Sequence, residues 1–131
     1  MAAALWQAVV RPVENGLQDK RFRKHNRLLK SADFQLVYQR GFKVVTHTLI
    51  FRVIPSEHQE PRIGLAISRK VGKAVKRNLI KRRTREAFRE KKASFKKGFD
   101  IVVSPRRGIL DRDFQDYLKS FDILLKKINR S

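Results

Sequence analysis

The feature that most restricts the fold of this chain is its basic central segment, residues 62–92. The segment holds thirteen Lys or Arg residues and two acids, Glu86 and Glu90. Such charge density is compatible with a disordered tail, but the apolar residues recur at helical spacing. At about 100° per residue, four side chains fall within one arc of roughly 100°: Ile80, Thr84, Ala87 and Phe88. Residues 74–92 are therefore predicted to form a helix packed on a core.

The opposite side of this predicted helix carries a row of donors: Asn78, Arg82, Arg85 and Arg89. Guanidinium groups match phosphate oxygens, and the Asn amide can bond a base edge or a ribose hydroxyl. A face that is only solvated would normally mix positive and negative charges, and Glu86 is the nearest acid to the row. The row is suited to following a nucleic-acid backbone rather than to reading a sequence.

The composition supports the same partner class. The chain has 131 residues, 32 of them Lys or Arg and 12 acidic, with a formal net charge of +20. The natural counterpart of such a charge is a polyanion, nucleic acid before an anionic membrane surface. There are no cysteines, which excludes disulfides, thiol nucleophiles and zinc–thiolate sites and is compatible with the cytoplasm.

The remaining pattern predicts a single α+β domain. Residues 1–20 are expected to be a poorly ordered extension, and residues 21–131 the domain. Ser31 is the expected N-cap of a helix over 32–40 that ends at Gly41. The other expected elements are strands at 42–45, 48–54, 62–68 and 100–104 and a last helix at 112–129, giving a mixed sheet of about four strands packed with three helices.

The strand expected at 62–68 has two unlike faces. Three larger side chains point one way: Ile63, Leu65 and Ile67. Three small residues point the other way: Gly64, Ala66 and Ser68. The small face either leaves a groove for a ligand or packs tightly under a helix, and the strand alone does not decide between them.

No catalytic centre and no metal site is predicted in the protein. The three histidines, His25, His47 and His58, lack the spacing of metal ligands. Three acids near residue 112 suit the positive end of the last helix better than a metal ion: Asp111, Asp113 and Asp116. No Gly-rich phosphate loop or nucleophile–base pair is visible.

One long stretch, RIGLAISRKVGKAVKRNLIKRRTRE at 62–86, resembles the signature of the bacterial ribonuclease P protein component. Asn26-Arg27-Leu28, Asp33-Phe34 and Tyr38 resemble the amino-terminal region of that family, and GFDIVV at 98–103 resembles one of its strands. The resemblance covers about residues 21–129. It implies an α+β fold like the second domain of ribosomal protein S5, with an unusual left-handed βαβ crossover.

The resemblance also implies a function. Members are the small subunit of a ribonucleoprotein that removes the 5′ leader of precursor tRNA. The RNA subunit performs the hydrolysis with Mg²⁺, and the protein binds that RNA and the leader. The expected partners are thus the catalytic RNA and precursor tRNA, with no membrane, no obligate protein partner and no protein-bound cofactor. The expected location is the cytoplasm.

Carried over by position, the expected contacts with the RNA subunit are Arg69, Lys70, Lys73, Arg77, Asn78, Lys81, Arg82 and Arg85, with Arg89 as the last member of the row. The leader-binding cleft maps to Phe34 and Tyr38, with Arg52, Ser68 and Lys70 as weaker candidates. Where the family commonly has Arg-Asn-Arg, this chain has Arg77-Asn78-Leu79. Arg83 is a candidate to replace the missing cation.

Three other functions remain open at this point. The first is a structural, ribosomal-type RNA-binding protein without a processing role. The second is a DNA-binding regulator that places the basic helix in the major groove. The third is a nuclease that acts without an RNA subunit, for which the acids offer no good metal constellation.

Overall fold

The structure is a computed structural model and describes residues 26–28 and 30–129. The extension expected at 1–20 and His25 lie outside the described residues. The helices are α1 (Ser31–Arg40), α2 (Ala74–Lys91) and α3 (Phe114–Ile128). The strands are β1 (Phe42–Val45), β2 (Leu49–Pro55), β3 (Arg62–Leu65) and β4 (Phe99–Pro105). Short 3-10 turns are η3 (Arg69–Val71), η4 (Lys92–Ser94) and η5 (Ile109–Asp111).

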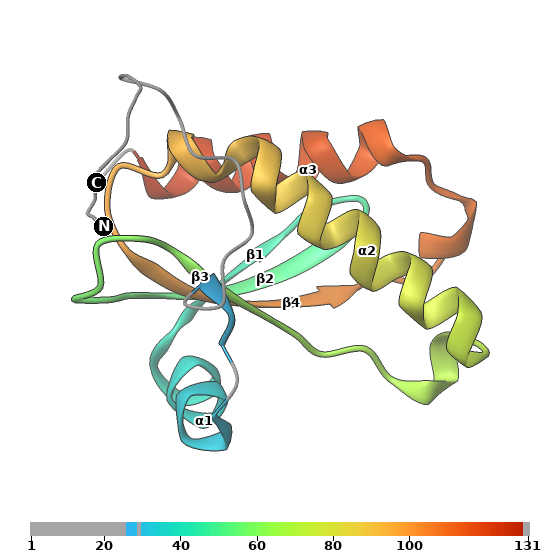
Figure 1. Cartoon of the computed structure of the whole chain (residues 1–131), viewed down its shortest axis with the longest axis horizontal. Coiled ribbons are helices and arrows are strands. Elements are labelled where there is room, and N and C mark those ends of the chain that lie inside the picture. Colours follow the sequence, from blue (N-terminus) through green and yellow to red (C-terminus); the bar gives the residue numbers. More distant parts are fainter. Residues whose placement is uncertain (1–25, 29, 130–131) are drawn as a thin grey trace.

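The four strands form one mixed sheet in the order β1-β2-β4-β3. Strand β2 is antiparallel to both of its neighbours, whereas β3 and β4 are parallel. In Figure 1, β3 lies in front of β4, both run to the right, and α2 returns above them. The β3–α2–β4 connection is therefore left-handed, against the strong general preference for right-handed crossovers. The predicted α+β domain is confirmed.

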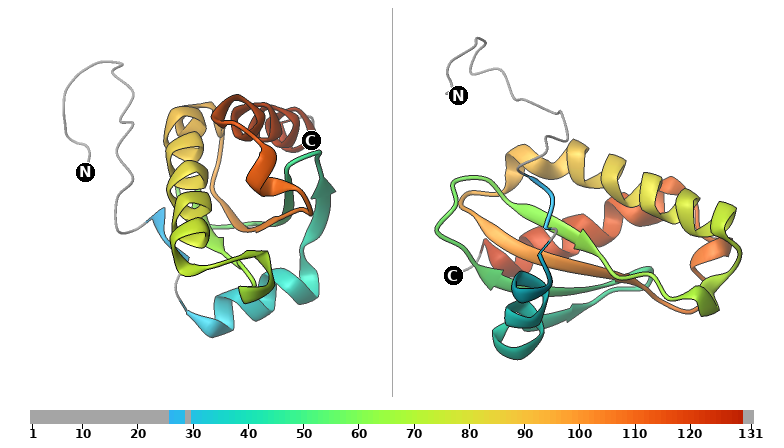
Figure 2. Two further views of the ribbon diagram at one scale, coloured as in Figure 1. Left: turned by 90° about the vertical axis from the view of Figure 1, so that its right-hand side faces the viewer. Right: turned by 60° about the horizontal axis from the view of Figure 1, so that its bottom comes forward.

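The helices cover both faces of the sheet, as Figure 2 shows. Helices α2 and α3 pack on one face, where most of the buried apolar side chains form the main core. Within that core the rings of Phe51 and Phe121 pack edge to face, with 5.1 Å between their centroids. Helix α1 lies on the other face over a smaller core around Leu28, Val37 and Val102. The buried residues of α2 are those that the helical spacing predicts: Ile80, Thr84, Ala87 and Phe88.

Several predicted ends of elements are wrong by one or a few residues, including those of α1 and β3. The N-cap of α1 is Lys30, and Ser31 is already helical. Strand β3 ends at Leu65 rather than at Ser68. The hydroxyl of Ser68 instead accepts a hydrogen bond from the backbone N–H of Lys70 and begins η3, so the chain turns away from the sheet before the predicted alternation is complete.

The start of α3 is closed by a capping box. The Asp113 carboxylate accepts from the N–H of Asp116, and the Asp116 carboxylate accepts from the N–H of Asp113, both at 3.1 Å. The expected placement of acids at the positive end of this helix is confirmed for these two residues. Asp111 lies earlier, in η5.

Candidate nucleic-acid interface

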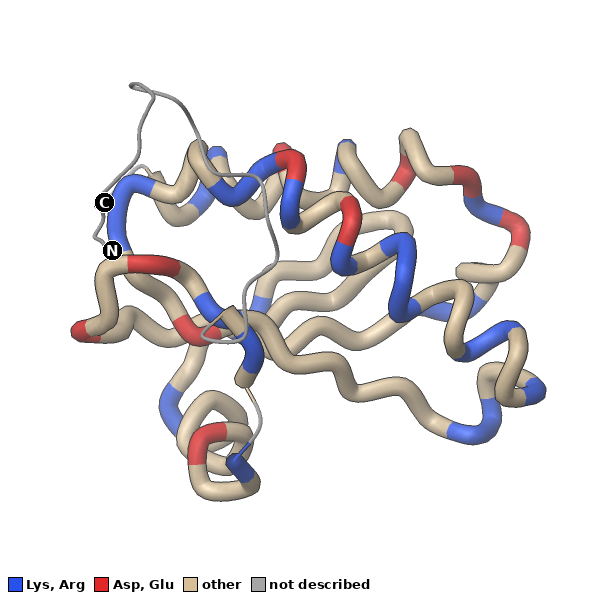
Figure 3. The backbone as a smooth tube through the Cα atoms, viewed as in Figure 1, with Lys and Arg blue, Asp and Glu red and all other residues tan. Residues whose placement is uncertain are grey.

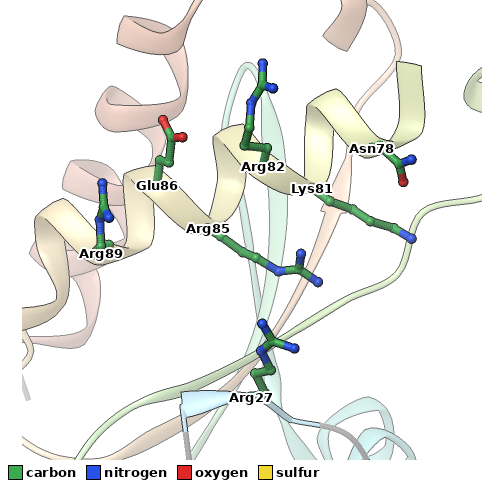
Figure 4. A pocket seen from close by; sticks show the side chains of 7 residues that line it. All are labelled: Arg27, Asn78, Lys81, Arg82, Arg85, Glu86 and Arg89. Carbon is green, nitrogen blue, oxygen red and sulfur yellow. The ribbon is translucent and has the colours of Figure 1, made fainter. Parts of the chain in front are cut away.

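Helix α2 presents its predicted row of donors to solvent. Its buried stripe faces the sheet, so Asn78, Arg82 and Arg89 are exposed and Arg85 is half-buried. All four line one pocket, shown in Figure 4. The complete lining is Arg27, Asn78, Lys81, Arg82, Arg85, Glu86 and Arg89.

A second pocket adjoins the first. It is lined by Arg27, Leu28, Phe34, Ile63, Gly64, Leu65, Lys81 and Arg85. The two pockets share Arg27, Lys81 and Arg85, so they form one groove between α2 and edge strand β3, which we call the α2–β3 groove. The groove begins at the exposed row and reaches an aromatic side chain on α1.

The positive charges in this groove are close enough to affect one another. Arg27 and Arg85 extend toward each other from opposite sides, as Figure 4 shows. Burial lowers the pKa of Arg85, and the positive charge of Arg27 lowers it further. Both effects disfavour the charged form of Arg85. An anion between the two guanidinium groups would reverse the second effect, so the groove favours a negatively charged ligand.

The expected cations ahead of the row continue the basic surface. Arg69 and Lys70 lie in η3 and Lys73 is the N-cap of α2, all three exposed, whereas Arg77 is half-buried. Figure 3 shows Lys and Arg following α2 and continuing into this turn, with several acids at the start of α3. None of these four cations lines the α2–β3 groove, so the predicted RNA-binding set divides into a groove group and a group at the start of α2.

Leu79, at the position of the usual third Arg, is half-buried. The Arg83 guanidinium donates to the backbone carbonyl of Arg112 at 2.9 Å and is held at the α3 side of the helix. The replacement of the missing cation by Arg83 stays a prediction, and it would require Arg83 to leave this hydrogen bond.

Phe34 is the aromatic residue of the groove. Its half-buried ring lies directly against Gly64, where an added Cβ atom would overlap Phe34 Cζ. At Gly64, therefore, the small face of β3 is packed under a helix, while the same ring lines the groove. An ion pair anchors α1 beside it: Arg62 forms a bidentate contact with Asp100, at 2.7 and 2.8 Å, and lies 3.8 Å from Asp33.

The other expected cleft residues do not join Phe34. Tyr38 is 44% exposed and its ring lies 5.1 Å from the Arg52 guanidinium, so these two residues form a separate cation–π pair. Ser68 and Lys70 lie at η3, beyond the end of the strand. None of the four lines the α2–β3 groove.

Arg27 is the groove residue to which sequence reasoning assigned no role. It belongs to the Asn26-Arg27-Leu28 motif, and a parallel β-bridge to Ile63 places it beside β3. The next residue, Leu28, donates its backbone N–H to the Ile63 carbonyl at 2.8 Å. The Asn26-Arg27-Leu28 motif was the sequence feature that could have pointed to Arg27. Its position opposite α2, however, results from the pairing with β3.

Within residues 26–28 and 30–129, no three His, Cys, Asp or Glu side chains form a group suited to a metal ion. His47 and His58 are exposed. In the same part of the chain, no helix combines the length and the apolar character that crossing a membrane requires.

The chain is similar to known proteins over most of its length. The family model for Ribonuclease P matches residues 22–129. The Ribonuclease P protein component of Caldanaerobacter subterraneus subsp. tengcongensis is 35% identical over 104 residues, covering 79% of this chain and 90% of that protein. The component of Petrotoga mobilis is 32% identical over 116 residues, covering 87% and 98%.

Two solved structures share the fold. The RNase P protein of Staphylococcus aureus has a TM-score of 0.70 at 33% identity and covers 79% of this chain and 94% of that one. The RNase P protein from Thermotoga maritima has a TM-score of 0.70 at 34% identity, covering 77% and 96%. The family match, the identities and the shared α+β fold agree, and this chain belongs to the ribonuclease P protein family.

Proposed function

We propose that this chain is the protein component of ribonuclease P, which binds the catalytic RNA and the 5′ leader of precursor tRNA and assists removal of the leader. Family membership supports the role. The observation that carries it in this chain is the α2–β3 groove, where the donor row of α2 meets Phe34. Arginine and asparagine donors suit a backbone of phosphates and riboses, and an aromatic ring suits an unpaired base.

In this proposal the hydrolysis belongs to the RNA subunit and its Mg²⁺ ions. The protein supplies positive charge where two polyanions, the catalytic RNA and its substrate, must approach each other. Each phosphate that a Lys or Arg neutralises releases counterions and reduces the repulsion between the RNAs. The protein is therefore expected to matter most at low magnesium, where fewer cations are present to screen them. The proposed location of this work is the cytoplasm.

Two groups of side chains are proposed to bind different RNAs. Asn78, Arg82 and Arg89 face outward and contact the catalytic RNA, together with the cations at η3. Phe34 and Tyr38 stack on unpaired leader bases, which requires no particular sequence. The contact between Tyr38 and Arg52 leaves Tyr38 partly exposed, so the ring is still available to a base.

The test is precursor tRNA cleavage by a bacterial ribonuclease P RNA at low magnesium, with and without this protein. We expect faster cleavage and correct mature 5′ ends only when both subunits are present. RNA binding without faster cleavage would favour a structural RNA-binding protein. Cleavage by the protein alone would favour a protein nuclease, and stronger competition by duplex DNA than by structured RNA would favour a DNA-binding regulator.

The leader contact has its own test, the substitution Phe34→Ala. Loss of one stacked base should weaken binding of leader-bearing precursor by about tenfold, and binding of mature tRNA much less. Phe34→Leu keeps apolar volume for the small core but removes the ring, so it separates stacking from folding. Phe42→Ala, at an aromatic that is 46% exposed on β1, is the matched control. Equal losses for precursor and mature tRNA would contradict a leader contact at Phe34.

A further inference from the structure

A buried polar cluster lies next to Arg27, and the proposed function makes no use of it. Asn26 is completely buried. Its amide Nδ2 donates to the Pro61 carbonyl at 2.9 Å and to Glu60 Oε1 at 3.2 Å. Its Oδ1 accepts from Lys92 Nζ at 3.2 Å. Lys92 is 6% exposed and forms an ion pair of 2.9 Å with Glu60.

This cluster joins three segments that are distant in sequence: the chain before α1, the loop before β3 and the η4 turn after α2. Burying an amide and an ammonium group costs free energy unless both are paired. Here each is paired, and the geometry of the three partners fixes where Asn26 lies. A buried, fully bonded side chain of this kind holds its backbone in one position.

Arg27 follows Asn26 directly. Its backbone is thus held from one side by the cluster and from the other by the hydrogen bond between Leu28 and Ile63. Its side chain is exposed and extends toward Arg85, with Lys81 on the same side of α2. Two guanidinium groups that face each other repel, and burial of Arg85 strengthens that repulsion. The cluster holds Arg27 in this arrangement, and an anion between the two guanidinium groups would be attracted to both.

A phosphodiester is the anion that this arrangement fits. It carries one charge and two unesterified oxygens, and each guanidinium fork can bind such oxygens with paired N–H donors. The adjoining part of the groove contains the ring of Phe34, against which a nucleotide base can lie. A carboxylate would satisfy the charges but offers no base for that ring.

We propose that Asn26, together with Glu60 and Lys92, is a positioning residue that holds Arg27 opposite Arg85, and that Arg27, Arg85 and Lys81 bind one RNA phosphodiester between them. This inference rests on the proposed function. It adds Arg27 to the RNA-binding residues and gives the buried cluster a role in binding.

The test measures the affinity of the full chain for leader-bearing precursor tRNA over a range of salt concentrations. Arg27→Ala should weaken binding about tenfold, the effect of losing a charged hydrogen-bond pair, and should reduce the slope of log affinity against log salt by about one unit. Asn26→Ala leaves the net charge unchanged, yet it should reduce the slope by nearly the same amount. The double variant should show no further loss, because Asn26 acts through Arg27.

Two controls match these substitutions. Ser120→Ala also removes a buried hydrogen bond, the one of 2.8 Å to Thr46, but it does so near the β1–β2 turn. It should lower stability without changing the slope. Lys127→Ala removes an exposed charge on α3 and should leave the affinity within about twofold of that of the unchanged protein. If Asn26→Ala does not fold, Lys92→Met breaks the same cluster while keeping the apolar part of the side chain.

The possible results separate the two proposals. If the unchanged protein binds the RNA and Arg27→Ala keeps the full salt slope, no phosphodiester is bound at Arg27. If Arg27→Ala reduces the salt slope but neither Asn26→Ala nor Lys92→Met reduces it, the cluster does not position Arg27. Either result overturns this inference and leaves the proposed function intact. Failure of the unchanged protein to bind the RNA would overturn both.

Discussion

Gly64 determines how close α1 can come to the sheet. The Phe34 ring occupies the space that a side chain at position 64 would need. Gly64→Ala should therefore displace the ring, lower the free energy of unfolding by about 1–3 kcal/mol, and weaken precursor tRNA binding more than mature tRNA binding. Urea denaturation and binding assays measure the two effects.

A double substitution tests the same contact from the other side. In a Phe34→Ala background the space above position 64 is vacant, so Gly64→Ala should then cost much less stability than in the unchanged protein. Additive losses in stability would mean that the two residues do not interact.

Tyr117 gives a residue-scale prediction about pH. Its side chain is buried in the main core, and burial raises its pKa above the ordinary value, partly opposed by the charge of Arg83. In the unfolded chain the phenol ionises near pH 10, whereas in the folded chain it keeps its proton. The unfolded state then binds fewer protons, so this contribution to stability is present below pH 10 and is lost as the pH rises toward the folded-state pKa.

Tyr117→Phe should remove that dependence. Above pH 10 the free energy of unfolding should fall more steeply with pH in the unchanged protein than in the Phe variant, as measured by urea titrations at several pH values. Parallel curves for the two proteins would show that Tyr117 has the same pKa in both states.

At the scale of one element, α2 has two different faces. The apolar face is set by four buried side chains and anchors the helix on the sheet. The row on the other face belongs to the same rigid helix, so its donors keep one-turn spacing without any ligand. This is what distinguishes α2 from a flexible basic tail, which would have to become ordered on binding.

The row predicts the salt dependence of RNA binding. Arg82→Ala combined with Arg85→Ala should reduce the slope of log affinity against log salt by about two units, one for each lost phosphate contact. Lys126→Ala combined with Lys127→Ala removes the same charge from exposed positions on α3 and should change the slope far less. An unchanged salt slope in the double arginine variant would show that Arg82 and Arg85 do not contact RNA phosphates.

The whole molecule carries a formal net charge of +20, and its cations gather along α2 and η3. Self-repulsion of this size destabilises the compact state, and any anion that binds only the folded protein stabilises it. Inorganic phosphate should therefore raise the free energy of unfolding more than chloride does at equal ionic strength. The expected gain is about 1.4–2.7 kcal/mol at ten to a hundred times its dissociation constant.

Part of that gain should come from the α2–β3 groove. Arg27→Ala should reduce the stabilisation by phosphate, because Arg27 lines the groove. Lys127→Ala should not reduce it, because Lys127 lies outside the groove. Thermal or urea unfolding in matched phosphate and chloride buffers measures the difference. Equal stabilisation by the two anions would show that charge screening alone accounts for the effect.

The sequence by itself determined the features that depend on short-range periodicity. The buried stripe of α2, its exposed donor row and the capping acids of α3 were all predictable. These features repeat every few residues, so the side chains that share a face are close in sequence as well as in space. Among the predicted helices and strands, the errors lie at the ends, such as the N-cap Lys30 and the early end of β3.

Tertiary structure alone decided how distant segments meet. Arg27 enters the groove through its bridge to Ile63, and Asn26 reaches Lys92 across 66 positions of sequence. Phe34 packs on Gly64 of β3 because α1 lies on that face of the sheet rather than on the face covered by α2 and α3. Contacts of this kind depend on strand order, crossover hand and packing of the whole chain, and no local pattern of residues specifies them.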